Sequence, residues 1–485
     1  MTFVNLTKFS FPHFSKLKNS KNSWRKNQFE TSKTREETKK GFKGVREKVL
    51  CDMQKNKSGN SVEEKWLNSL FSNKTQNNWG GFENWKKLSQ KVLANTSIPS
   101  KKDESWRFTP LSKLFEMDFS GIETIKYPEL PKKFFISVSA ARVVYVNSLF
   151  SKGSSFFKNL PENVFIGSIK DLGENRKQEV LELLSKGESG IDGGFFPLLN
   201  MSCLNDIIVL EIPKNLTISE PIHIVFAGFS EEKSVNFNPR LVILAGENSS
   251  SNIIEHHIGI ENSQYFDNSA TSILLQKGSN VNFTFLNEIP ESSSQVSSIH
   301  VDSRKETFFD FKSISFGGFM SRISLGVDMN GINSSCKVRG LSVAKEVQVA
   351  DFHSRISHNF PKCQSSQLQK NLVTGKAQGI FAGKIQVQHG AFDTQSDQLC
   401  KTLLLSSKAK IDALPILEIN NENVKCTHGS TVSDLDENQV FYFQSRGISQ
   451  EKARYLLTIG FVDEMIQGLP ENVMDRFSKF IDSFL

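Results

Sequence analysis

Hydrophobic residues near the start of the chain repeat at helical spacing. From about residue 62 to residue 116 they recur every three or four positions, as on one face of an α-helix. The repeating positions are Trp66, Leu67, Leu70 and Phe71, followed by Trp85, Leu88, Val92 and Leu93. No tryptophan occurs beyond residue 106, and such a composition shift indicates a domain border. We therefore predict a small helical N-terminal domain over residues 62–135.

From residue 136 to residue 425 the pattern changes to short runs rich in Phe and β-branched residues. The runs include residues 207–210, 241–244, 281–286 and 308–316. Clusters of Gly, Ser and Asn separate them at intervals of a few tens of residues, as turns do. The pattern predicts a repetitive all-β core in which strands bury alternate residues. A parallel β-helix, a sandwich and a barrel all satisfy it, and periodicity leaves the choice open.

The last part of the chain, residues 426–485, returns to helical spacing. Asp436 is a plausible N-cap for a first helix, which Gly447 ends. Ser449 can cap a second helix, and Gly468 and Pro470 separate it from a third. These amphipathic helices have more apolar surface than they can bury alone. We expect them to pack on the β core, on one another or on a partner.

The positive charge of the chain lies almost entirely in its first 60 residues. The formal net charge is +7, but residues 1–60 have 15 basic and 5 acidic residues, so the remainder is slightly acidic. A nucleic-acid partner is therefore not indicated. The leader is rich in Lys, Ser, Asn and Phe, has no acidic residue before Glu30, and lacks the apolar core of a secretory signal. We predict that residues 1–60 are an organelle transit peptide or a disordered leader.

The cysteines indicate the redox state of the cellular compartment, and the apolar runs indicate whether the chain enters a membrane. Six cysteines are scattered without a C-x-x-C pair, so neither a disulfide framework nor a zinc knuckle is indicated, and a reducing compartment fits best. No stretch approaches the roughly 18 consecutive apolar residues of a membrane span. We expect a protein that does not enter a membrane.

Specific motifs occur in three separate regions. Residues 422–461 read ENVKCTHGSTVSDLDENQVFYFQSRGISQEKARYLLTIGF, and residues 363–387 read CQSSQLQKNLVTGKAQGIFAGKIQV. Residues 414–419 read LPILEI, and residues 101–114 read KKDESWRFTPLSKL. Together these segments resemble the SufB/SufD family of iron-sulfur cluster assembly proteins. The Cys-Thr-His-Gly segment at 426–429 and the Glu-x-Trp-Arg-Phe-Thr motif at 104–109 resemble the SufD branch, of the plastid type. Ser430 and Ser433 depart from the usual Ala and Gly, which puts the local turn geometry in doubt.

The resemblance implies a mainly β fold, a right-handed parallel β-helix with small helical domains at both ends. It also implies a non-enzymatic scaffold subunit that pairs with a SufB-type subunit and docks a SufC-type ABC ATPase. The chain itself would hold no cofactor stably, and a transient iron-sulfur cluster would form at the interface with SufB. Eukaryotic Suf systems are found in plastids, so the chloroplast stroma is the expected location, with the mitochondrion as the second choice.

Cys426 and His428 are the candidate residues for chemistry. In an extended strand, residues i and i+2 point to the same face, so a thiolate and an imidazole could approach one iron from one side. Both are ligand types that hold iron-sulfur clusters. By resemblance, His428 faces a SufB cysteine across the interface and is the candidate iron ligand. Without the resemblance, Cys426 reads as a small buried hydrophobe and His428 as a turn residue.

The C-terminal helices supply the candidate docking surface for the ATPase. Its candidate residues are Tyr442, Arg446, Leu456 and Phe461, although Leu456 and Phe461 could also pack internally. The chain has no P-loop, because Gln378 and Ile385 occupy the required Gly and Ser/Thr positions around Gly383 and Lys384. ATP hydrolysis must therefore come from another subunit.

The sequence favours the other histidines less as metal ligands, and it favours two alternative functions less than the scaffold role. His353, His358 and Cys363 have no familiar metal-site spacing, and His256 and His257 should point to opposite faces of a strand. A SufB-type paralogue that itself holds the cluster is one alternative, disfavoured by the Cys-Thr-His-Gly segment. A β-helix enzyme acting on polysaccharides is the other, disfavoured by the absence of a secretory signal and of an acidic pair beyond Asp393 and Asp397.

Overall fold

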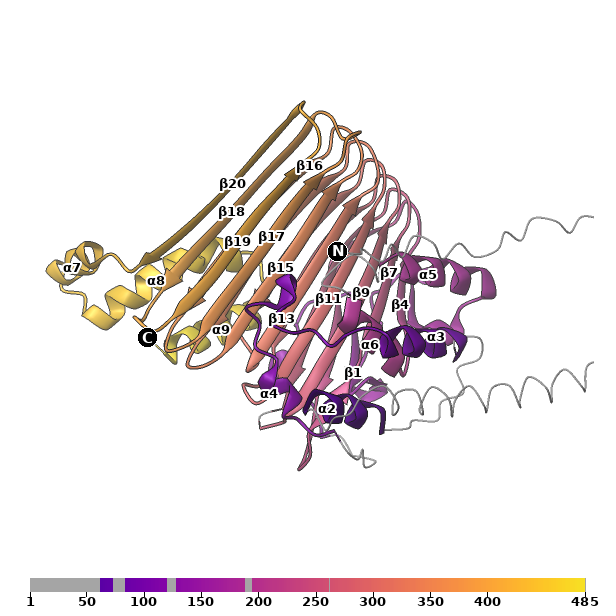
Figure 1. The fold of residues 1–485 in the computed structure, drawn as a ribbon, viewed down its shortest axis with the longest axis horizontal. Coiled ribbons are helices and arrows are strands. Elements are labelled where there is room, and N and C mark those ends of the chain that lie inside the picture. Colours follow the sequence, from indigo (N-terminus) through magenta and orange to yellow (C-terminus); the bar gives the residue numbers. More distant parts are fainter. Residues whose placement is uncertain (1–61, 73–82, 120–127, 188–193, 261, 485) are drawn as a thin grey trace, which may run out of the picture. The chain divides into compact units, whose positions relative to one another are not determined.

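A computed structural model describes residues 62–72, 83–119, 128–187, 194–260 and 262–484. The expected leader, residues 1–60, lies outside the described residues. Residues 62–485 form one compact unit, which is built around two long parallel sheets (Figure 1). The expected parallel β-helix with helices at both ends is confirmed.

From β7 to β20, consecutive strands alternate between the two sheets, so each pair of strands makes one coil of the β-helix. Sheet A has the order β2 (Leu149–Phe150), β1 (Ala141–Val146), β5 (Thr217–Gly228), β8 (Ser250–Gly259), β10 (Asn280–Glu288), β12 (Phe308–Ser315), β14 (Ser335–Ala344), β16 (Gln364–Val373), β18 (Thr394–Leu404), β20 (Val424–Asp434). Sheet B has the order β19 (Lys410–Ile419), β17 (Gln378–Val387), β15 (Val349–His358), β13 (Met320–Met329), β11 (Ser294–Ser303), β9 (Tyr265–Leu275), β7 (Arg240–Ala245), β4 (Ile208–Ile212), β3 (Phe165–Ser168), and β6 (Val235–Phe237) also pairs with β9. In register, Ser250 pairs with Asn280 and Asn280 with Phe308. One coil therefore takes roughly 30 residues, which explains the spacing of the turn clusters.

One corner of the β-helix repeats the same backbone conformation from coil to coil. Asn248, Glu306, Asn333, Lys362 and Asp393 all have φ between 53° and 60°. Each donates its backbone N–H to a carbonyl of the following coil, as Asn248 does to Lys277 at 2.9 Å. The left-handed conformation tightens the corner, and Asn and Asp tolerate it better than most residues. The Asn-rich turn clusters are therefore the corners of the coils.

Alternate residues of every strand point into the β-helix and form its core. Aromatic side chains stack from coil to coil, with ring centroids 6.1 Å apart for Phe283 and Phe311 and 6.3 Å apart for Phe311 and Phe352. The rings of Phe283, Phe311 and Phe352 are completely buried in this stack. At roughly 25 cal/mol per Å² of apolar surface, such burial is the main force that holds the coils together.

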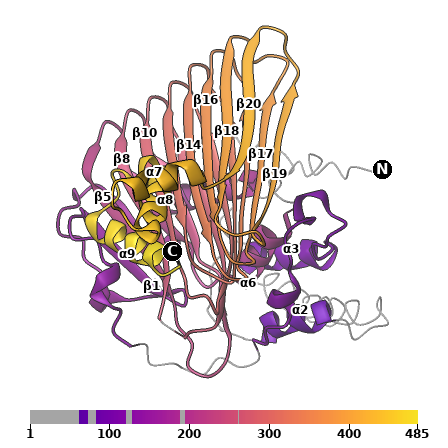
Figure 2. The same cartoon turned by 90° about the vertical axis from the view of Figure 1, so that its left-hand side faces the viewer.

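The helices at the C-terminal end lie beside sheet A (Figure 2). They are α7 (Glu437–Ser445), α8 (Gln450–Ile466) and α9 (Glu471–Asp482), and α8 and α9 cover part of the outer face of that sheet. The expected caps are confirmed, because Asp436 accepts from the N–H of Asn438 and Ser449 from that of Lys452. The border expected between residues 425 and 426 falls inside β20, because that strand still pairs with β18 along its whole length.

The helices near the N-terminal end pack against the outer face of sheet B. They are α2 (Val62–Ser72), α3 (Glu83–Ala94) and α4 (Ser112–Phe115), together with the short 3-10 helix η2 (Glu104–Trp106). Helices α5 (Glu174–Gly187) and α6 (Phe195–Cys203) lie between β3 and β4 in the chain, and η3 (Lys132–Phe134), η4 (Lys152–Ser154) and η5 (Ile169–Asp171) are further 3-10 turns. Trp66 and Leu93 share a core with residues of α6 and of sheet B.

A buried ion pair fastens this N-terminal region to the β-helix. The guanidinium of Arg322 lies 2.6 Å from Asp351 and stacks 3.8 Å from the Trp106 ring, and the Thr109 hydroxyl donates to Asp351 at 2.6 Å. Burial would raise the pKa of Asp351, but the charge of Arg322 and the contact with His353 outweigh it and hold that pKa at about 2. The Glu-x-Trp-Arg-Phe-Thr motif is thus a structural clamp.

Asp351→Asn should destabilise the chain by about 3–5 kcal/mol, because it removes the carboxylate charge that lies 2.6 Å from the fully buried guanidinium of Arg322. Urea unfolding of the full chain measures this loss. Glu116→Gln is the matched control, since that carboxylate pairs with Lys113 at an exposed site, where a pair contributes about 0–1 kcal/mol. Equal losses in the two variants would contradict the clamp.

Candidate functional site at the open end of the β-helix

Strands β19 and β20 are the last strands of the two sheets, and no described element covers this end of the β-helix. These strands have 10 and 11 residues, and each pairs with only one neighbour among the elements that the structure describes. At the other end, by contrast, the outermost strands β2 and β3 are short and antiparallel. Val432 and Ile419 are 51% and 41% exposed. Long unpaired strand edges are templates for pairing with another chain.

Cys426 and His428 both lie on β20 at this open end. In register, Cys426 stands opposite Ser396 and His428 opposite Gln398 on β18. Ser396 and Gln398 are buried and point into the β-helix, so the two candidate residues share its interior face. Cys426 is half-buried and packs against the core cluster, whereas His428 is exposed.

The thiol and the imidazole differ in what they can do here. Burial raises the pKa of the Cys426 thiol, so the thiolate that binds metal or acts as a nucleophile is disfavoured in this chain alone. His428 keeps a ring nitrogen available at the open end. The arrangement therefore offers an imidazole ligand directly and a thiol ligand only beside a cation.

Two inward positions of sheet A change from aromatic to polar toward this end. In sheet A, the inward residues of β12 include Phe309 and Phe311, whereas the corresponding positions on β16 and β18 are Ser365, Gln367, Ser396 and Gln398. The Oγ atoms of Ser365 and Ser396 are 2.8 Å apart, and Gln398 donates to Gln367 at 2.8 Å. Our sequence reasoning missed these residues, although the alternating polar residues of SSQLQ in strand β16 could have indicated them.

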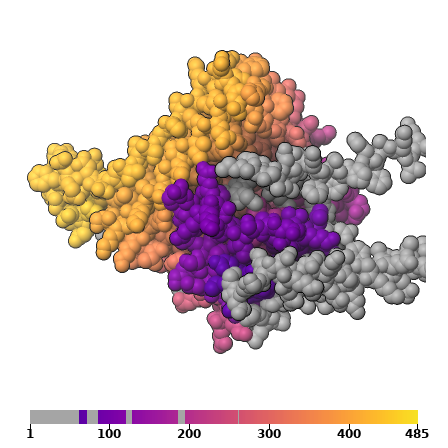
Figure 3. Space-filling model, in the orientation of Figure 1, coloured from indigo at the N-terminus to yellow at the C-terminus, as the bar shows by residue number. Residues whose placement is uncertain are grey.

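The C-terminal helices present the four candidate docking residues in different ways. Tyr442 and Leu456 are 57% and 38% exposed, and Arg446 is also exposed and lies 3.3 Å from the Tyr442 hydroxyl. Phe461 instead packs against the cluster beneath α8 and faces Lys370. Sequence reasoning missed Phe441, which is 70% exposed. Figure 3 shows the C-terminal helices projecting from the coils.

The remaining candidate ligands do not converge. His353 pairs with Asp351, His358 lies 2.9 Å from the Ser365 hydroxyl, and Cys363 donates to the Gly331 carbonyl. Among the residues that the structure describes, no group of three or more His, Cys, Asp or Glu side chains is arranged to hold a metal ion.

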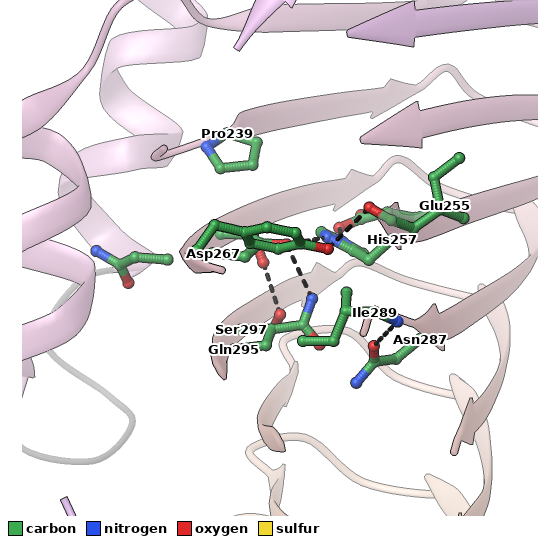
Figure 4. Close-up of polar contacts among 12 residues, drawn as sticks. Pro239, Glu255, His257, Asp267, Asn287, Ile289, Gln295 and Ser297 are labelled. Carbon is green, nitrogen blue, oxygen red and sulfur yellow. Dashed lines mark hydrogen bonds and ion pairs between the residues drawn. The ribbon is translucent and has the colours of Figure 1, made fainter. Parts of the chain in front are cut away.

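His256 and His257 point to opposite sides of β8, as expected. His256 lies 3.2 Å from His223 and 3.1 Å from Glu288, which Arg476 of α9 grips with two hydrogen bonds. His257 points inward and lies 2.6 Å from Asp267 and 2.8 Å from Glu255 (Figure 4). Because carboxylates occupy both of its ring nitrogens, His257 is an imidazolium with no nitrogen left for a metal.

Family models match two adjacent parts of the chain. Residues 228–461 match the model described as "SUF system FeS cluster assembly, SufBD core domain", and residues 61–224 match "SufBD protein N-terminal region". The chain belongs to the SufBD family. It is thus an iron-sulfur cluster assembly protein of that family, as the resemblance implied.

Three relatives match most of the length of this SufBD family member. It is 29% identical to an iron-sulfur cluster assembly SufBD family protein of Synechocystis, over 78% of this chain and 85% of the relative. It is 28% identical to the chloroplastic protein ABCI7 of Arabidopsis thaliana, over 82% and 85%. It is 26% identical to the iron-sulfur cluster assembly protein SufD of Escherichia coli, over 80% and 90%. Across its described residues, no helix combines the length and apolar character needed to cross a membrane.

The buried His257 should make stability fall as the pH rises from 6.5 to 9. Burial lowers the pKa of His257, but the charge of Asp267 and the hydrogen bonds to Asp267 and Glu255 outweigh it and raise that pKa to about 9. The stabilising contribution of His257 is therefore complete below about pH 6.5, the pKa of histidine in the unfolded chain, and is lost as the pH passes about 9. The shift corresponds to about 3 kcal/mol.

Urea unfolding of wild type and His257→Gln between pH 6 and 10 measures this contribution. The stability difference between the two should shrink across that range. The exposed His389 provides the control, because His389→Gln should leave a constant difference. A His257→Gln difference independent of pH would show that His257 is not charged in the folded chain.

Proposed function

We propose that this chain is a SufD-type subunit of a SufB–SufC–SufD scaffold on which iron-sulfur clusters are assembled, and that it works in a plastid. The relative named SufD and the chloroplastic relative support the branch and the compartment. In this role the chain is a scaffold subunit and not an enzyme. The iron-sulfur cluster is its cargo, formed transiently at the interface with the SufB-type subunit.

The single observation that carries the proposal is the open end of the β-helix. The free edges of β19 and β20 present backbone groups over 10 and 11 residues, and the inward side chains beneath them are partly exposed. A SufB-type partner with a similar uncovered end would satisfy both the strand edges and the apolar residues. That contact would place His428 and Cys426 at the seam between the subunits, where two chains can share one cluster.

Helix α7 is the proposed docking element for the SufC-type ATPase. Val440 is its one buried residue within the described structure, whereas Phe441 and Tyr442 are mostly exposed. By contrast, α8 is fixed to sheet A, because Lys312 donates to the carbonyl of Gln467 and Lys370 to that of Phe461. An aromatic pair on a weakly packed helix is a typical anchor for a partner.

Two surface variants should separate the two contacts. Val432→Asp places a charge on the open end and should abolish co-purification with the SufB-type subunit, while SufC-type binding persists. Phe441→Ser should reduce SufC-type binding by tenfold or more and leave the SufB-type contact. An aromatic side chain that becomes buried in an interface contributes about 2 kcal/mol or more to binding. Each variant is the control for the other, and Val347→Asp, at a corner residue 56% exposed, is a further control. Loss of both partners in either variant would contradict separate surfaces.

His428→Ala should lower the cluster content of the complex without loosening it. Full-length chain is co-purified with SufB-type and SufC-type subunits, reconstituted anaerobically with iron and sulfide, and analysed for iron, sulfide and absorbance. His389→Ala, at another exposed histidine, should retain the wild-type content. If no complex forms, the SufD-type assignment fails. A stable cluster on the isolated chain would instead indicate the SufB-type role.

A further inference from the structure

The inward residues behind His428 form a connected row across the last coils. Gln367 of β16 donates its amide to the Ser354 hydroxyl at 2.6 Å, and Gln398 of β18 donates its amide to the Gln367 carbonyl oxygen at 2.8 Å. Gln398 stands opposite His428 on β20. The row therefore runs from the middle of the β-helix to its open end.

This row fixes which way the Gln398 amide points. Its Nε2 is committed to Gln367, so its Oε1 is turned to another neighbour. That oxygen is buried and has no hydrogen-bond partner among the residues that the structure describes, and the residue is 2% exposed. Buried acceptors in folded proteins are nearly always paired. The oxygen is therefore prepared to accept a hydrogen bond.

His428 is the neighbour best placed to donate. Adjacent strands lie about 4.8 Å apart, and paired residues on one face are within side-chain reach. The inward residues beside it on β20 have other neighbours, since Cys426 stands opposite Ser396 and Ser430 opposite Cys400. The exposed ring of His428 is free to turn toward Gln398.

Gly383 on the facing strand β17 makes room for the Gln398 amide. A Cβ atom at this position would lie 2.2 Å from Gln398 Nε2 and 2.9 Å from its Cδ, closer than real contacts allow. The same Cβ atom would lie 2.5 Å from Cζ of Phe381, so any other residue at 383 would displace the amide, the Phe381 ring or both. Both sheets of the β-helix thus contribute to holding Gln398 in this orientation.

We infer that Gln398 is a positioning residue for His428. Its Oε1 accepts the N–H of one ring nitrogen, which fixes the tautomer and leaves the lone pair of the other nitrogen facing the open end. Ligating histidines are commonly oriented in this way by an acceptor behind them. The inference deepens the proposed function and rests on it, since the free nitrogen would meet iron at the seam with the SufB-type subunit.

The tautomer of His428 tests the inference without any cluster. Full chain carrying ¹⁵N-labelled histidine is recorded at pH 8.5 by long-range ¹H–¹⁵N correlation, and His428→Asn identifies the signals of residue 428. Wild type should show one dominant tautomer. Gln398→Met, which keeps the side-chain size and removes the acceptor, should change the tautomer ratio by about fivefold, the effect of one hydrogen bond of ordinary net strength.

Three further variants complete the experiment. Gly383→Ala should have the same effect as Gln398→Met, and it keeps the test decisive if the latter fails to fold. Gln398→Glu retains an acceptor oxygen and should restore the single tautomer. Gln369→Met is the matched control, because Gln369 is an equally buried inward amide in a row that does not contain His428. An unchanged ratio in folded Gln398→Met, or an equal change in Gln369→Met, overturns the inference.

Failure of the inference and failure of the proposed function give different results. If the tautomer does not respond but His428→Ala lowers cluster content in the complex, only the role of Gln398 is wrong. If His428→Ala leaves cluster content unchanged, the proposed role of His428 is wrong whatever the tautomer does. In the complex, Gln398→Met should lower cluster content while the partners still co-purify.

Discussion

Parallel strand pairing is the constraint on which the rest of this structure depends. Each coil of roughly 30 residues satisfies its backbone and buries its Phe and β-branched residues only against the coils beside it. A stack of this kind cannot end without leaving strand edges. At the N-terminal end, the short antiparallel strands β2 and β3 are the outermost. At the other end β19 and β20 have no such neighbour among the described elements, which makes this end the natural place for a partner.

The inward side chains of sheet A differ between the middle coils and the last coils of the β-helix. In the middle coils, stacked rings such as Phe283 and Phe311 fill part of the space between the sheets, beside polar pairs such as His257 with Asp267 and Ser269 with Ser297. In the last coils, Ser and Gln side chains replace the rings. Polar groups are costly inside a protein unless they are paired, so the unpaired oxygen of Gln398 beside an open end points to a function at that end.

The helices fall into two groups, those that are bonded to the stack of coils and α7, whose aromatic side chains stay exposed. Arg476 of α9 grips the buried Glu288, and Lys312 and Lys370 of sheet A hold carbonyls at or near the end of α8. Near the N-terminal end, Arg322 and Asp351 hold the segment that contains Trp106. In the described structure α7 has no such bond to the sheets; its Glu437 pairs with Arg454 of α8, and its Phe441 and Tyr442 lie at the surface. Because α8 and α9 are fixed to the β-helix, α7 is left with a defined exposed surface.

Local spacing alone determined the helices at the two ends of the described chain, the caps at Asp436 and Ser449, the turn clusters, and the fact that Cys426 and His428 share a face, because these features depend on residues near one another in the chain. It did not predict α5 and α6, which lie inside the region expected to be all β. Only motif resemblance chose the β-helix among the all-β folds. The tertiary structure decided which strands pair, and therefore that His428 stands opposite Gln398. It also decided that Trp106 stacks on Arg322, since these residues are far apart in sequence. Contacts of that kind leave no local period, and only the stacked coils bring them together.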